Sequence, residues 1–101
     1  MFVYNITIKV DNLIADDWLQ WQKEINIQEV LDSGLFYDHG IFRLLDQDDT
    51  EGKTFVIQYF AHSRKDYERF VQYHAATLFE KAKEKWGHHF ITFQTLLQAV
   101  Q

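Results

Sequence analysis

The chain has 101 residues, 47% of them hydrophobic and 17% aromatic, which is enough for one hydrophobic core but not for two. Fifteen acidic against ten basic residues give a formal charge of −5, and this charge repels nucleic acid and anionic membrane surfaces. Cysteine is missing, so disulfides and thiolate sites are excluded, and no apolar run reaches the roughly 20 residues of a membrane-spanning helix. We expect a single domain over residues 1–101, located in the cytoplasm.

The first predicted strand covers Phe2–Val10, where residues on one side are consistently apolar and those on the other are mixed. Because it begins so early, we expect no signal peptide. A helix is predicted over Ile14–Asp32, with two acidic residues in its first turn and Ser33 and Gly34 at its end. Its inward stripe is predicted to be Ile14, Trp18, Trp21 and Ile25, followed by Val30 and Leu31.

Two further strands are predicted over Phe36–Gln47 and Lys53–His62, joined as an antiparallel hairpin by the acidic loop DDTEG. Ser63, with Asp66 three residues later, predicts the N-cap of a second helix, and Gly87 predicts its end. The inward stripe of this helix is predicted to be Tyr67, Phe70, Val71, His74, Leu78 and Ala82. A last strand is predicted over His88–Gln98.

This order of elements, βαββαβ, predicts an α+β ferredoxin-like fold with two helices on one face of a four-stranded antiparallel sheet. The uncovered face is predicted to be too apolar for water, so we expect a homodimer packed through it as a dimeric α/β barrel. The alternative is a monomer with an apolar face. We assign to that face either Val3, Asn5, Thr7 and Lys9 or the opposite set of the first strand, together with Val56, Gln58, Phe60, Phe90, Thr92, Gln94 and Leu96.

Five segments of the chain resemble a small bacterial family of domains of unknown function in the dimeric α/β-barrel superfamily. They are YNITIKV from Tyr4, WLQWQKEINIQEVLDSGLF from Trp18, FVIQYFAHS from Phe55, the helix around His74, and FITFQTLLQ from Phe90. The resemblance implies a ferredoxin-like dimer without an assigned activity. More distantly, the layout is similar to cofactor-independent antibiotic-biosynthesis-type monooxygenases and to haem-degrading enzymes. These pair a histidine on the second helix with an asparagine on the first strand.

His74 is therefore the candidate catalytic residue, with Asn5 as its possible partner. An imidazole inside an apolar stripe titrates near neutral pH and suits a general base or a donor to a ligand. The structural alternative is a core histidine bonded to a tyrosine hydroxyl or a carbonyl. Tyr4, Trp18, Trp21, Tyr59 and His74 are the candidate ligand-binding residues, lining a cavity for a small apolar or aromatic molecule. Aromatic side chains that simply fill the core are the alternative.

We expect no metal site and no cofactor. His88 and His89 are neighbours on a predicted strand and so point to opposite faces, and His39 and His62 lack a third ligand. Two function classes stay open. One is a small-molecule-binding or structural module, and the other is a cofactor-independent monooxygenase or isomerase that acts on a small aromatic or polyketide-like compound with His74 as general base.

Overall fold

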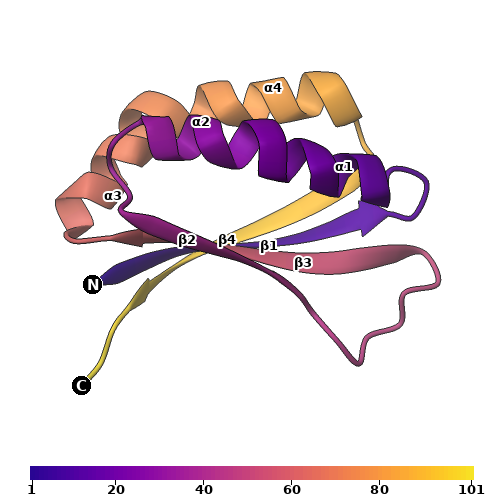
Figure 1. Cartoon of the computed structure of the whole chain (residues 1–101), viewed down its shortest axis with the longest axis horizontal. Coiled ribbons are helices and arrows are strands. Elements are labelled where there is room, and N and C mark those ends of the chain that lie inside the picture. Colours follow the sequence, from indigo (N-terminus) through magenta and orange to yellow (C-terminus); the bar gives the residue numbers. More distant parts are fainter.

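A computed structural model describes the whole chain, residues 1–101 (Figure 1). Its four strands are β1 (Phe2–Asp11), β2 (Asp38–Arg43), β3 (Gly52–Ala61) and β4 (Phe90–Gln98). They form one sheet in the order β2-β3-β1-β4, and every neighbouring pair is antiparallel. The predicted ferredoxin-like α+β fold is confirmed.

Two long helices lie side by side on one face of the sheet, and the opposite face carries none (Figure 1). The first is α1 (Ala15–Trp21) continued by α2 (Ile27–Asp32), with a π-helical turn between them, η1 (Gln22–Asn26). The second is α3 (Arg64–Phe70) continued by α4 (Ala76–Trp86), with the π-helical turn η2 (Val71–Ala75) between them. No helix has both the length and the apolar composition needed to cross a lipid bilayer.

Both predicted ends of the second helix are present in the structure. The backbone N–H of Asp66 donates to the Ser63 hydroxyl oxygen at 3.2 Å, which satisfies a donor that the helix itself leaves free. Gly87 follows α4 with a φ of 62°, a backbone angle that residues with a Cβ rarely adopt. Local sequence therefore sets where this helix begins and ends.

The second strand is shorter than the predicted Phe36–Gln47. Phe36 is only 5% exposed and packs in the core ahead of β2, which starts at Asp38. At the other end, the Leu44 N–H donates to the Thr54 carbonyl at 2.9 Å, and beyond it Asp46 takes a φ of 60°. Because β2 ends at Arg43 and β3 begins at Gly52, the connection is longer than the predicted loop.

The predicted stripe of the first helix is wrong at Ile25 and right at Val30 and Leu31, which belong to the core or pack against it. Ile25 is 46% exposed, whereas Gln22 and Ile27 are each only 4% exposed. A π-helical turn uses one residue more than an α-helical turn, so η1 brings Gln22 and Ile27 inward and leaves Ile25 outside. In the second helix η2 displaces only His74 from the predicted stripe, whereas the later residues Leu78 and Ala82 still face inward.

Strand pairing determines which side chains face the helices. Tyr4 on β1 pairs with Tyr59 on β3 and with Leu96 on β4, so these three lie on the same face. Tyr59 and Trp18 are almost completely buried there, and the Trp18 ring lies 5.3 Å from that of Phe55. This layer of aromatic rings between sheet and helices forms the core.

The open face differs from the prediction on β4. On β1 the predicted set Val3, Asn5, Thr7 and Lys9 is correct. On β3 the predicted residues Val56, Gln58 and Phe60 are also correct. Phe90, Thr92, Gln94 and Leu96 instead face the helices, because they pair with the inward residues of β1. The β4 residues on the open face are Ile91, Phe93, Thr95 and Leu97.

Candidate functional site

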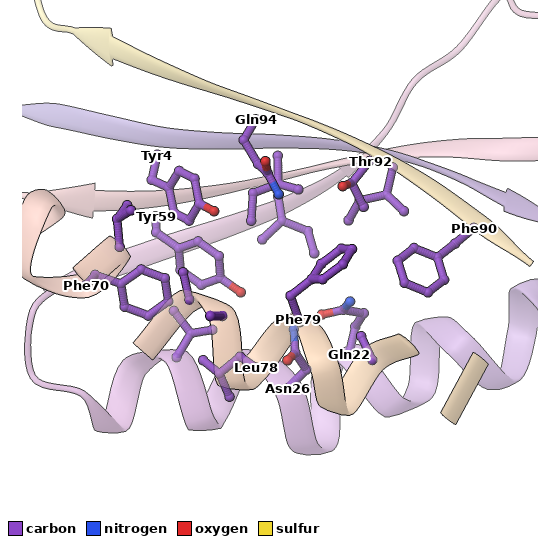
Figure 2. A pocket seen from close by; sticks show the side chains of 18 of the residues that line it. Tyr4, Gln22, Asn26, Tyr59, Phe70, Leu78, Phe79, Phe90, Thr92 and Gln94 are labelled. Carbon is purple, nitrogen blue, oxygen red and sulfur yellow. Dashed lines mark hydrogen bonds between the residues drawn. The ribbon is translucent and has the colours of Figure 1, made fainter. Parts of the chain in front are cut away.

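The two helices and the sheet border a cavity of about 530 Å³ that is partly open at the surface (Figure 2). Twenty residues line it and 16 of them are hydrophobic, which is typical of pockets for small molecules. Its exposed wall residues are Val71, Ala76 and Phe79 on the second helix and Gln94 on β4. The cavity therefore opens between that helix and the edge strand of the sheet.

Three of the five predicted ligand-binding residues, Tyr4, Trp18 and Tyr59, lie in the cavity wall. Trp21 does not. Its ring is buried and packs edge-on against Trp86, with ring centroids 5.9 Å apart, so it is part of the core at one side of the cavity. The structure thus separates two tryptophans that the helical repeat alone places on one stripe.

His74 is also absent from the cavity wall. It lies in η2, where the extra residue of the π-helical turn gives the inward position to Ala75. The His74 ring is half-buried and stacks on Phe70 with centroids 5.8 Å apart. Asn5 lies on the open face of the sheet, where its side-chain oxygen accepts a hydrogen bond from Gln58 at 3.0 Å. The structure does not bring His74 and Asn5 together.

Tyr4 and Tyr59 stand next to each other on paired strands, with ring centroids 6.3 Å apart. Burial, and secondly the nearby Tyr67, raises the pKa of Tyr4 to about 12. Burial, with a smaller contribution from Tyr4, raises the pKa of Tyr59 even further. Both phenols therefore stay protonated at neutral pH and act as hydrogen-bond donors.

The Tyr59 hydroxyl has no hydrogen-bond partner although the residue is 0% exposed. Figure 2 shows the hydroxyls of Tyr4 and Tyr59 pointing from the sheet into the space below it. A buried hydroxyl without a partner is costly, and such groups are rare in folded proteins. The Tyr59 hydroxyl is therefore a donor that an acceptor atom at this end of the cavity would satisfy.

The sequence did not single out Gln22 and Asn26 as site residues. Both are in η1 and line the cavity, and the Asn26 amide N–H donates to the Gln22 side-chain oxygen at 2.8 Å. Gln22 is 4% exposed and is the only polar residue other than tyrosine in the buried core. The signal for it was the six-residue step between Trp21 and Ile27, which does not fit a regular helical repeat.

The other histidines lie away from the cavity. His62 stacks on Tyr37 with ring centroids 4.0 Å apart. His88 and His89 come before β4 rather than in it, so the alternation of a strand does not separate them, and their rings are 4.4 Å apart. His89 Nδ1 lies 2.8 Å from an oxygen of Asp11. No group of three or more histidine or carboxylate side chains is placed to hold a metal ion.

The cavity wall contains no carboxylate, imidazole, ammonium or guanidinium group. Its polar atoms are phenol and alcohol hydroxyls, an indole N–H and side-chain amides. Such a wall can orient an uncharged molecule by hydrogen bonds, whereas a charged ligand would lose its hydration without gaining a partner. The arrangement favours binding over proton transfer.

Solved structures with the same fold include a dimeric ferredoxin-like protein from an uncultured marine organism, with 15% identity and a TM-score of 0.68 over 99% of this chain and 95% of that one. An antibiotic biosynthesis monooxygenase has 16% identity and a TM-score of 0.69 over the full length of both chains. SnoaB, a cofactor-independent oxygenase from Streptomyces nogalater, has 11% identity and a TM-score of 0.63 over 99% and 94%. At these identities the likeness shows the fold alone.

Among curated proteins, no sequence matches this one. The family model described as a domain of unknown function, DUF4286, matches residues 1–100, nearly the entire chain. The predicted resemblance is therefore confirmed, and the chain belongs to the DUF4286 family.

Proposed function

We propose that this protein binds a small, mostly apolar aromatic molecule in the cavity between its helices and its sheet. The observation that carries the proposal is the volume of about 530 Å³ left open by a largely hydrophobic wall. The rings of Tyr4, Phe36, Tyr59 and Phe70 pack closely in the neighbouring core, with centroids of contacting pairs 5.0 to 6.3 Å apart. The space of the cavity nevertheless stays unfilled. Mostly apolar cavities of this size with a few polar groups are typical sites for small molecules.

A neutral fluorescent dye, N-phenyl-1-naphthylamine, tests the proposal because its emission rises in apolar surroundings. We expect saturable binding to the native protein. Ala82→Phe places a ring in the cavity wall and should weaken binding at least about tenfold, an effect of about 1.4 kcal/mol. Thr77→Phe makes a similar gain in size at an exposed position outside the wall and should leave affinity unchanged. If neither substitution changes the affinity for the dye, the result would contradict the proposal.

We also propose that two copies of the chain pack through the open face of the sheet. Large apolar side chains remain uncovered there, with Phe93 71% exposed, Ile91 63% and Leu97 45%. The dimeric ferredoxin-like protein described above has the same fold and supports a second copy as the occupant. Apolar patches of this kind on a free surface usually mark an interface.

The mass of the particle in solution tests the dimer. Light scattering should report two chains of 12.2 kDa each. Phe93→Glu puts a charge on the uncovered face, on edge strand β4, and should give a single chain at micromolar concentration. Leu13→Glu makes a comparable change at an 83% exposed residue outside the sheet face and should leave the dimer intact. A native protein that runs as one chain would remove this proposal.

The enzymatic alternative, a cofactor-independent monooxygenase or isomerase with His74 as base, receives its support from the described activity of SnoaB. In this chain a general base would have to come from outside the cavity wall, since the wall holds none. His74→Ala tests it. If the protein is a binding module, this variant keeps the affinity for the dye and no turnover depends on the imidazole. The cytoplasmic location stays a prediction.

A further inference from the structure

The polar groups of the cavity are unevenly distributed. The phenols of Tyr4 and Tyr59 come from the sheet, and the Gln22–Asn26 amide pair comes from η1 on the opposite wall (Figure 2). The other hydrogen-bonding side chains of the wall are Tyr67 on α3, Thr92 and Gln94 on β4, and Trp18 on α1. The rest of the wall is mainly hydrocarbon and aromatic. A molecule in this space thus meets hydrogen-bonding groups at defined places, and these can select among ligands of similar shape.

On the sheet side of the cavity, phenol hydroxyls can donate hydrogen bonds to a ligand. The Tyr59 hydroxyl has no partner and no contact with solvent, and Tyr4 beside it is 7% exposed. On the opposite wall, the Gln22–Asn26 hydrogen bond uses the Gln22 oxygen and one N–H of Asn26, so this pair offers a ligand both donors and an acceptor. The hydroxyls of Tyr4 and Tyr59, on neighbouring strands, suit an oxygen atom that accepts hydrogen bonds.

The charge of the ligand is limited by the same wall. An anionic ligand would need a cationic side chain, and the cavity wall has none. The formal charge of −5 over the whole chain also disfavours anions. A cationic ligand would equally lack a carboxylate partner. The acceptor is therefore best supplied by an uncharged group.

We propose that the cavity selects an uncharged, planar aromatic carbonyl compound whose carbonyl oxygen accepts a hydrogen bond from the Tyr59 hydroxyl, with Tyr4 as the second donor. This inference rests on the proposed binding function and adds the chemical class of the ligand. The carbonyl satisfies the buried hydroxyl that the folded chain leaves without a partner, and the rings occupy the apolar part of the space.

Three probes that share one ring system test the inference, namely naphthalene, 2-acetylnaphthalene and 2-naphthoate. Dissociation constants are measured from chemical-shift changes in amide NMR spectra of the native protein. We expect 2-acetylnaphthalene to bind about three- to tenfold more tightly than naphthalene, the range for one hydrogen bond. We expect 2-naphthoate to bind more weakly than either.

Two conservative variants locate the effect. Tyr59→Phe should bring 2-acetylnaphthalene down to the affinity of naphthalene, and Tyr4→Phe should reduce the difference in part. Tyr73→Phe removes a hydroxyl from a residue that is 67% exposed and should keep the full preference. The naphthalene affinity provides the check that each variant still forms the cavity.

The results distinguish selection of a carbonyl group from small-molecule binding as such. If naphthalene and 2-acetylnaphthalene bind native protein equally, or if 2-naphthoate binds most tightly, the carbonyl inference is overturned while small-molecule binding stands. A preference for the ketone that survives Tyr59→Phe also overturns it. If none of the three binds, the binding function falls and the inference falls with it.

Discussion

Replacing Tyr59 with phenylalanine should stabilise the free protein, an unusual direction for a change in a packed core. The substitution keeps the ring, which packs 5.4 Å from that of Phe36, and removes only a hydroxyl that is buried without a partner. Burying an unsatisfied polar group costs about 1–3 kcal/mol, and the void left by one oxygen atom offsets a small part of the gain. We expect the free energy of unfolding to rise by about 1–2 kcal/mol.

Thermal unfolding measures this change directly. For a domain of about this size, 1 kcal/mol corresponds to a shift in Tm of about 4–8 °C, so Tyr59→Phe should melt at least about 4 °C higher. Native protein and variants must be compared at one concentration, because assembly of a dimer makes Tm depend on it. Tyr73→Phe, the same chemical change at an exposed residue, should leave Tm within about 1 °C.

A lower Tm for Tyr59→Phe, with Tyr73→Phe unchanged, would refute the reasoning. That result would mean that the hydroxyl has a favourable partner in the folded protein. The expected pattern couples opposite signs in one variant, a more stable free protein and a weaker complex with 2-acetylnaphthalene. Proteins commonly show this trade-off where a binding group is held ready at a cost in stability.

Three other substitutions test separate parts of the structure. Trp18→Ala should lower the free energy of unfolding by about 3–5 kcal/mol in urea denaturation, because the ring is 1% exposed and packs against Phe55. Ser63→Ala should cost about 1 kcal/mol, whereas Ser63→Asp, which can also accept from the backbone of Asp66, should cost much less. Tyr4→Phe should flatten the loss of stability at alkaline pH. The unfolded chain ionises this phenol from about pH 10, whereas the folded chain ionises it only near pH 12. The contribution of Tyr4 to native stability is therefore complete below pH 10, and it falls by up to about 1.4 kcal/mol per pH unit between pH 10 and pH 12.

The order and type of the elements could be predicted because each depends on a local pattern. Alternation showed the unequal faces of β1, and Ser63 and Gly87 marked the ends of the second helix through groups that the helix backbone leaves free. The absence of helices from one face followed from connection handedness. None of these inferences required knowledge of which distant residues touch.

The predictions were wrong where contacts between distant residues, or an irregular helical turn, determine which side chains face inward. Phe90 and Phe93 are both aromatic, so alternation alone cannot say which of them faces the helices, and pairing of β4 with β1 settles it. His74 fitted the stripe of a regular helix, but η2 gives its place in the cavity wall to Ala75. A π-helical turn has no compositional signature, and only the phase of later apolar residues reveals it.

The two π-helical turns have a consequence for how the chain can tolerate changes in length. A single-residue deletion within an ordinary α-helical stretch rotates everything beyond it by about 100° and turns inward side chains to the outside. At η2 the surplus residue already exists, so loss of exposed Gln72 or Tyr73 restores a regular helix with Ala75 still facing inward. Deletions among related chains should therefore concentrate at the exposed positions of η1 and η2, which leaves the cavity-lining residues in place.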